Sequence, residues 1–174
     1  MPAGATRVVN QDRLGTRLAI CAQTGEEPIL RGNRRVTATA VWVGDAGREL
    51  RRVAAGQAAC DPAWAPDGRL LALTALDGLW VFSAESAAGS RRVDAKSADS
   101  SEFAYRAFSR PRWSPDGALI ALLVTNGGTS WVQVFDAASG RSFYTSPPET
   151  YSFQWGGDAR ELTVGTTKVR LPAR

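Results

Sequence analysis

Arginines gather in residues 24–35 of this chain, and arginine and aromatic side chains together gather in residues 94–110. Arginine supplies several hydrogen-bond donors and aromatic rings supply broad contact area, so the combination is typical of residues that dominate protein interfaces. We therefore predict that these segments bind a protein or peptide. The side chains that we predict to make this contact are Arg31, Arg34, Arg35, Phe103, Tyr105, Arg106, Phe108 and Arg110. In the alternative interpretation, Phe103, Tyr105 and Phe108 plug the mouth of the ring and the arginines stay solvated.

No set of residues in the sequence resembles a catalytic centre. The chain contains no histidine, which removes the commonest general base and the commonest metal ligand. Glu149, Asp158 and Glu161 form no evident pair for acid–base chemistry. Asp67 and Asp116 each stand alone in a turn, whereas a calcium loop needs several closely spaced oxygen donors. We assign no catalytic residue, no metal ligand and no cofactor, and we expect that the protein is not an enzyme.

The chain has two cysteines, Cys21 and Cys60. Two cysteines alone cannot form a structural zinc site, which needs four ligands. We expect both to be buried as small hydrophobic residues. A disulfide between them is the alternative, and it would require an oxidising compartment.

Length, composition and charge fit one soluble domain. A chain of 174 residues can bury a sizeable core, and its 44% hydrophobic and 22% charged residues are ordinary for a globular protein. The net charge of +4 permits an acidic partner. No nucleic-acid-binding motif accompanies this charge, so we do not expect nucleic acid as a ligand.

The sequence leaves the cellular compartment open. No apolar run approaches the roughly 18 residues of a membrane-spanning helix, and the first residues lack the apolar stretch of a signal peptide. A cytoplasmic protein fits these observations, and so does a periplasmic protein whose leader has been removed.

Residues 62–73 and 111–122 repeat nearly the same sequence, with Trp113 standing 49 positions after Trp64. In each run a Trp precedes Pro-Asp-Gly, and an apolar segment follows. Pro fixes φ at the second position of a turn, and Asp and Gly suit the next two positions, so each run predicts two strands joined by a tight turn. An internal repeat of this length determines the architecture of the whole chain.

Each repeat continues as a four-stranded antiparallel unit. The second strands, residues 70–73 and 119–124, are apolar at nearly every position, which indicates strands covered on both faces. A third strand, a turn containing glycine and a shorter polar fourth strand follow. This order is typical of the blade of a β-propeller.

Weaker copies of the repeat begin and end the chain. We therefore predict an all-β fold, a small β-propeller of about four antiparallel blades in one domain, residues 1–174. The units are about 5–56, 57–105, 106–148 and 149–174, and the last one lacks its fourth strand. Only residues 101–108 have a sequence that could form one or two helical turns.

The repeats resemble the TolB-type, WD-repeat-like propeller family, whose hallmark is Trp-Ser-Pro-Asp-Gly before an Ile-Ala strand. Residues 113–117 with Ile120 and Ala121 match this pattern fully, and residues 64–68 depart from it only at Ala65. The resemblance implies the fold. It leaves activity open, because family members range from periplasmic partner-binding proteins to the gating domains of serine peptidases. A peptidase half is not expected here, since the chain has no Gly-x-Ser-x-Gly motif and no histidine.

Four units are few for this family, which commonly has about six or more blades. We expect a closed or nearly closed four-bladed ring, whose last edge is left open or is filled by residues 1–6. An open arc that pairs with a second copy through its exposed edge and a piece of a longer protein are the alternatives.

The loops between strands two and three and the links between blades emerge on one face of a propeller. Residues 24–35 and 94–110 are such connections, so we predict that both lie on the same face and that this face binds the partner. The alternatives are an assembly role, in which another chain such as a second copy completes the last blade, and a small-ligand binder or hydrolase that uses the central channel.

Overall fold

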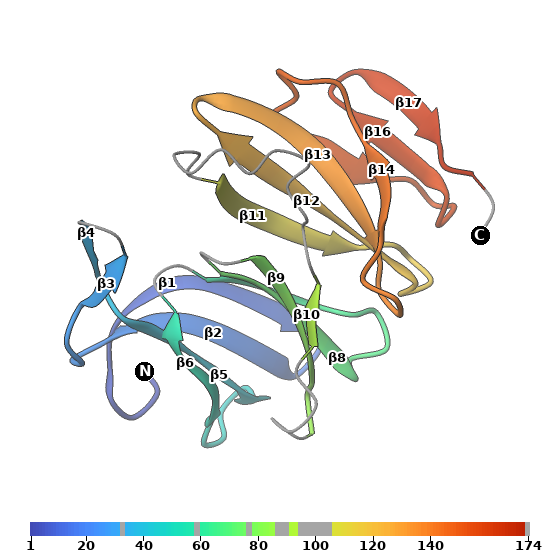
Figure 1. Cartoon of the computed structure of the whole chain (residues 1–174). Helices are drawn as coiled ribbons and strands as arrows, with labels where there is room; N and C mark the ends of the chain where they lie inside the picture. Colours follow the sequence, from blue (N-terminus) through green and yellow to red (C-terminus); the bar gives the residue numbers. More distant parts are fainter. Residues whose placement is uncertain (32–33, 58–59, 76–77, 86–90, 94–105, 173–174) are drawn as a thin grey trace.

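The structure is a computed structural model that describes residues 1–31, 34–57, 60–75, 78–85, 91–93 and 106–172. Throughout this part of the chain the regular elements are β-strands, arranged in four antiparallel sheets and one small hairpin (Figure 1). The first sheet contains β1 (Ala5–Leu14), β2 (Arg17–Thr24), β5 (Thr39–Asp45) and β6 (Arg51–Gln57). The second contains β7 (Asp61–Trp64), β8 (Leu70–Ala75), β9 (Gly78–Ser83) and β10 (Arg91–Val93). The third contains β11 (Arg106–Trp113), β12 (Leu119–Asn126), β13 (Thr129–Asp136) and β14 (Ser142–Thr145). The fourth contains β15 (Phe153–Trp155), β16 (Glu161–Val164) and β17 (Thr167–Arg170), and the hairpin is β3 (Ile29–Arg31) with β4 (Arg34–Val36).

Each sheet is a propeller blade. Its strands are neighbours in chain order, and the first strands β1, β7 and β11 of successive sheets contact one another. This arrangement confirms the predicted all-β fold of a small propeller with antiparallel blades.

The turn predicted from Pro-Asp-Gly forms in both clear repeats. The Gly68 N–H donates to the Ala65 carbonyl at 2.8 Å, and the Gly117 N–H donates to the Ser114 carbonyl at 2.9 Å. Both glycines have positive φ, 68° and 71°, a region that costs other residues free energy. In the second turn, Asp116 Oδ1 accepts from the Ser114 hydroxyl at 2.6 Å. The repeated Pro-Asp-Gly residues therefore close the turns. The prediction that Asp67 and Asp116 are turn residues is correct.

The apolar second strands are buried on both faces, as their composition predicts. Along β12, Ile120 and Leu122 contact the second sheet, while Leu119 and Ala121 lie in the cluster shared with the fourth sheet. Strand β8 behaves likewise between the first and third sheets. The core is therefore divided into layers between successive blades.

The repeated tryptophans join neighbouring blades. The indole Nε1 of Trp113 donates to the Ala63 carbonyl at 2.9 Å, and the Nε1 of Trp155 donates to the Arg112 carbonyl at 3.0 Å. Each acceptor lies on the first strand of the preceding blade. The prediction that these tryptophans are packing residues is correct. Trp113 and Trp155 also form a hydrogen bond to the preceding blade, which the sequence analysis did not predict.

The expectation of two separate buried cysteines is wrong, because Cys21 and Cys60 form a disulfide. Their Cα atoms are 5.8 Å apart, and the two residues are 0% and 2% exposed. Cys21 lies in β2, and Cys60 directly precedes β7. The approach of two blades brings the sulfur atoms together, which the spacing of the two residues along the chain does not reveal.

The four sheets form an open arc, one of the alternatives to the closed or nearly closed ring that we expected. Core clusters join the first sheet to the second, the second to the third and the third to the fourth. None of the clusters seen in the described residues joins the fourth sheet to the first, and Figure 1 places these two sheets at opposite ends of the arc. The angle between neighbouring blades decides whether four of them complete a circle, and the repeat does not specify that angle.

Residues 1–6 do not fill the edge of the fourth sheet, which has three strands in the described part of the chain. Ala5 and Thr6 begin β1 instead, and the Ala5 N–H donates to the carbonyl of buried Pro2 at 3.1 Å.

The expected helical turns between residues 101 and 108 are wrong where the structure tests them. Arg106, Ala107 and Phe108 pair with β12 as the start of strand β11, and residues 101–105 lie outside the described part. Within the described residues there is no helix of the length and apolar character needed to span a membrane.

Candidate binding site

The connection between β2 and β5 contains an element that the sequence analysis missed. Strands β3 and β4 form a hairpin in which Leu30 lies opposite Arg35 and Arg31 lies opposite Arg34. Arg35 is exposed, whereas the side chains of Arg31 and Arg34 lie outside the described part. The dipeptide Gly32-Asn33 between two apolar-basic runs was the signal that could have predicted this hairpin.

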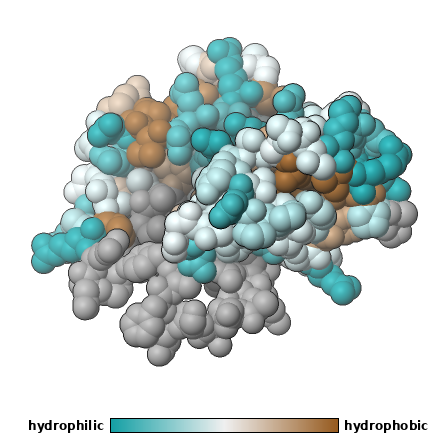
Figure 2. Space-filling view, turned by 90° about the horizontal axis from the view of Figure 1, so that it is seen from above, coloured by the Kyte–Doolittle hydropathy of each residue, from teal (hydrophilic) through white to brown (hydrophobic). Residues whose placement is uncertain are grey.

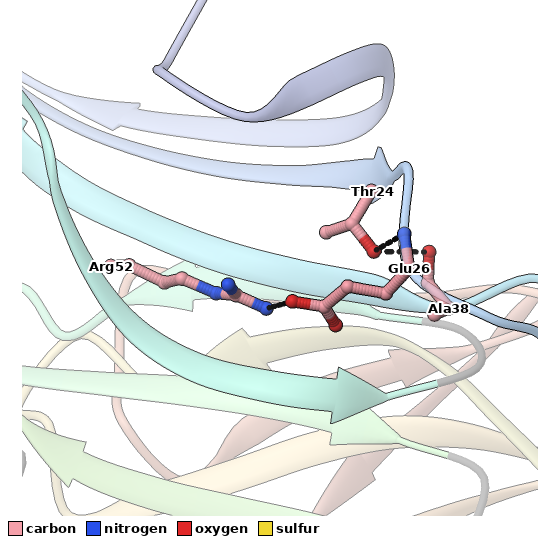
Figure 3. A network of polar contacts seen from close by, with 4 residues as sticks. All are labelled: Thr24, Glu26, Ala38 and Arg52. Carbon is pink, nitrogen blue, oxygen red and sulfur yellow. Dashed lines mark hydrogen bonds and ion pairs between the residues drawn. The ribbon is translucent and has the colours of Figure 1, made fainter.

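Polar contacts attach the base of this connection to the first sheet, as Figure 3 shows. The Thr24 N–H donates to the Ala38 carbonyl at 3.0 Å, and the Thr24 hydroxyl accepts from the Glu26 N–H at 3.4 Å. The Glu26 carboxylate pairs with the Arg52 guanidinium at 2.6 Å, and that guanidinium lies 5.7 Å from the centre of the Trp42 ring. The connection therefore leaves the sheet from a fixed base.

The second predicted segment is described only from Arg106 onward. Phe103 and Tyr105 lie outside the described residues, as does the side chain of Arg106. Phe108 is partly buried against the core cluster between the second and third sheets. Phe108 is therefore a packing residue between two blades, and it neither plugs a central channel nor stands free as a contact residue.

Arg110 has an unusual backbone. Its φ is 54°, in the left-handed region that is costly for residues other than glycine. The pairing of β11 with β12 shifts between Ser109 and Arg112, next to Pro111. The Arg110 N–H donates to Asp61 Oδ2 on the second sheet at 2.7 Å, and the Arg110 side chain is exposed. An aspartate that the sequence analysis did not single out thus holds this arginine in place.

The two predicted segments leave corresponding ends of their sheets. In the first sheet, the connection follows Thr24, which lies opposite Ala5 at the start of the first strand. In the third sheet, Arg106 starts the first strand and lies opposite Asn126 at the end of the second. Because the sheets are repeats of one blade, these ends lie on one face of the propeller. We call it the long-loop face, defined by the described residues 24–31, 34–35 and 106–110.

The described part of this face carries exposed hydrogen-bond donors. Arg35 and Arg110 are exposed guanidinium donors. In the ranges that the structure describes, no three cysteine, aspartate or glutamate side chains gather as a metal site would require. Figure 2 shows a neighbouring side of the molecule, seen from above, which is mostly hydrophilic and carries separate hydrophobic areas rather than one continuous patch.

The sequence matches a known family over most of its length. Residues 12–163 match the β-propeller domain of lipoprotein LpqB. The chain belongs to the LpqB β-propeller family. Among curated proteins, none matches the sequence.

Solved structures similar to this LpqB-family chain are propellers of several functions. TolB from Acinetobacter baumannii is 15% identical with a TM-score of 0.63, and the match covers 91% of this chain and 37% of TolB. An acylaminoacyl peptidase from Pyrococcus horikoshii is 12% identical with a TM-score of 0.63, over 90% of this chain and 27% of the peptidase. An oligogalacturonate lyase in complex with manganese is 14% identical with a TM-score of 0.60, over 84% of this chain and 43% of the lyase.

The chain spans less than half the length of each of these three structures. At such low identities the likeness concerns the fold. TolB, a peptidase and a lyase share it, so function has to be argued from the residues of this chain.

Proposed function

We propose that this LpqB-family chain is a non-enzymatic binding module, built from TolB-type repeats, whose long-loop face contacts a protein or peptide. Arg35 and Arg110 are the described side chains that would make the contact. Arg31, Arg34, Phe103, Tyr105 and Arg106 remain predicted contributors from the same two segments.

The observation that carries the proposal is the backbone of Arg110. A left-handed conformation costs a residue with a side chain about 1–2 kcal/mol, and such costs concentrate at functional sites. Here the Asp61 carboxylate accepts a hydrogen bond from the Arg110 backbone N–H at 2.7 Å, and the Arg110 guanidinium remains exposed. This backbone bond joins two blades, and it also holds the exposed side chain of Arg110 in one place, so a contact residue at this position would lose less entropy on binding.

The family and the disulfide suggest where the partner is found. The family is described as a lipoprotein domain, and the disulfide between Cys21 and Cys60 fits an oxidising compartment outside the cytoplasm. We therefore place the partner among the proteins of the cell envelope.

The proposal is tested by placing a photoreactive amino acid at Arg35 and, as a control, at Arg160. Arg160 is exposed between β15 and β16, on the face opposite the long loops. With envelope proteins as the target, we expect a specific cross-link from position 35 and none from position 160. Equal cross-linking from both positions would contradict the proposed face.

The captured partner then allows a quantitative test of Arg110. The variant Arg110→Gly keeps the positive φ and the N–H that Asp61 accepts, so it removes only the side chain. We expect its Kd for the purified partner to rise at least tenfold, which is about 1.4 kcal/mol. The matched variant Arg160→Ala should bind like the wild type. An unchanged Kd for Arg110→Gly would remove Arg110 from the site.

A second candidate function is assembly, in which another chain adds a strand beside β17. The observation that favours it is the fourth sheet, which has three strands in the described part where the other sheets have four. The solution mass, considered in the Discussion, distinguishes this role from the first.

A further inference from the structure

The connection between β14 and β15 lies on the long-loop face, although the sequence analysis did not single it out. We call residues 146–152 the Pro-Tyr link. The Thr150 N–H donates to the Ser130 carbonyl at 2.9 Å, and Ser130 lies beside the turn between β12 and β13. Arg106 at the start of β11 lies opposite Asn126, which begins the same turn. The link therefore leaves the end of the third sheet at which β11 enters it.

Hydrogen bonds hold the backbone of the Pro-Tyr link in place. The buried hydroxyl of Ser146 accepts from the Val132 N–H and donates to the Pro147 carbonyl, both at 2.9 Å. The Thr150 hydroxyl donates to the same carbonyl at 3.0 Å. At its other end, the Ser152 carbonyl accepts from an N–H of the turn after β16 at 2.9 Å. The exposed side chains of the link are therefore attached to a fixed backbone.

Glu149 has a backbone conformation that favours glycine. Its φ is 62°, and Arg110 is the other described residue with a side chain in this left-handed region. Pro148 precedes it, and a residue of positive φ after the proline of a turn is usually glycine or asparagine. The chain therefore carries the Glu149 carboxylate at a conformational cost, and such costs concentrate at functional sites.

Tyr151 is the exposed aromatic residue of the described chain. It is 58% exposed, whereas every other aromatic side chain that the structure describes is buried or half-buried. Pro147, Pro148 and Glu149 are exposed as well. Within the described ranges, no hydrogen bond or ion pair involves the Glu149 carboxylate or the Tyr151 hydroxyl. Both groups are therefore accessible to a partner.

We propose that the Pro-Tyr link binds a basic segment of the protein partner through lysine or arginine side chains. A carboxylate forms strong, charge-assisted hydrogen bonds with guanidinium and ammonium groups, and the face of a tyrosine ring attracts cations. Pro147 and Pro148 have no N–H group to donate. The exposed groups of the link therefore favour a cation over an acidic side chain.

This inference rests on the proposed function, because the link belongs to the same face. Arg35 and Arg110 are exposed donors of positive charge there, and Glu149 adds a negative charge at a different connection. A partner that fits the whole face therefore carries acidic groups opposite the arginines and basic groups opposite the Pro-Tyr link. Such complementarity of charge determines how a partner is oriented.

The test uses the full chain labelled with 3-fluorotyrosine, which gives one ¹⁹F signal for each of the three tyrosines. The signal of Tyr151 is assigned by its loss in Tyr151→Phe. The probe is amidated N-acetyl-Ala-Arg-Ala-Arg-Ala, and its control is the same peptide with citrulline, which resembles arginine in size and has no charge. We expect a saturable shift of the Tyr151 signal with the arginine peptide at millimolar concentration and none with the citrulline peptide.

Variants of Glu149 separate binding from stability. Glu149→Gln should weaken the arginine peptide by about three- to fivefold, the size expected of one exposed ion pair. The matched control Glu49→Gln removes the same charge from an exposed residue between β5 and β6, at the opposite end of a blade, and should bind like the wild type. Glu149→Gly should weaken the peptide without lowering the urea midpoint of unfolding, because glycine suits the positive φ.

The inference is overturned if the arginine peptide does not shift the Tyr151 signal, or if the citrulline peptide shifts it equally. It is also overturned if Glu149→Gln binds the peptide as tightly as Glu49→Gln does. Those results would leave a cross-link from position 35 unaffected, so the proposed function would stand. A missing cross-link from position 35 would instead contradict the proposed function itself.

Discussion

At the level of single residues, the repeated tryptophans occupy one sequence position but have different partners. Trp113 and Trp155 each connect two blades through an indole hydrogen bond. Trp64 packs in the same kind of layer, between the first and second sheets, without an acceptor among the described residues. The preceding strand β1 contributes the Asp12 carboxylate there, which accepts from the Trp64 backbone N–H at 2.7 Å.

This difference predicts unequal effects of two similar substitutions. Trp113→Phe removes a donor and leaves the Ala63 carbonyl without it, which costs about 1 kcal/mol. Trp64→Phe makes the same change from an indole to a phenyl ring, but it breaks no side-chain hydrogen bond that is seen among the described residues. We therefore expect the free energy of unfolding to fall by about 1 kcal/mol more in Trp113→Phe than in Trp64→Phe. Urea unfolding followed by circular dichroism measures both, and a larger loss in Trp64→Phe would contradict the assignment of these bonds.

At the level of elements, blades are held to their neighbours by several kinds of contact besides the indole hydrogen bonds. Apolar layers lie between sheets, and aspartates of first strands accept N–H groups of the next blade, as Asp12 and Asp61 do. The first interface has the disulfide in addition, and Asn10 beside it donates to the Cys60 carbonyl at 3.0 Å. The first two blades are therefore the pair that is joined covalently.

Reduction of the disulfide should destabilise the fold strongly. The bond joins cysteines 39 positions apart, and closing a loop of this size lowers the entropy of the unfolded chain by the equivalent of about 4 kcal/mol. We expect the free energy of unfolding to be about 3–4 kcal/mol lower with a thiol reductant. Urea unfolding with and without reductant measures this. The variant with both cysteines changed to alanine, itself insensitive to reductant, controls for other effects of the thiol, and coincident curves for the wild type would contradict the prediction.

At the level of the whole molecule, the open arc leaves two different ends. The outer face of the first sheet has an apolar cluster that includes Ile20 and Trp42. At the other end, the edge strand β17 has exposed Lys168 and Arg170, paired with Glu161 at 3.2 Å and Asp158 at 3.1 Å. Charged side chains on an edge strand hinder pairing with another chain.

The charges on β17 predict that the chain is a monomer in solution. Light scattering behind a sizing column should give a mass close to 18.6 kDa across a range of concentrations. A stable dimer would support the assembly role. In that case, Lys168→Glu should dissociate the dimer if the two chains pair along β17. The same variant should leave the mass of the dimer unchanged if the chains meet at the first sheet.

The sequence alone determined the blades. A Pro-Asp-Gly turn is decided by adjacent residues, so Gly68 and Gly117 have the positive φ that their turns require. The apolar runs of β8 and β12 likewise predict burial on both faces, because side chains alternate along any strand. The two predicted binding segments could be identified for the same reason, as long connections between recognisable strands.

Only the tertiary structure decided how the blades meet. Four features arise between residues far apart in the chain: the disulfide, the indole of Trp64 with no acceptor among the described residues, the bond from the Arg110 N–H to Asp61, and the opening of the arc. Their positions depend on the angles and distances between neighbouring sheets. Those angles result from the packing of whole side-chain layers, and no short run of sequence specifies them.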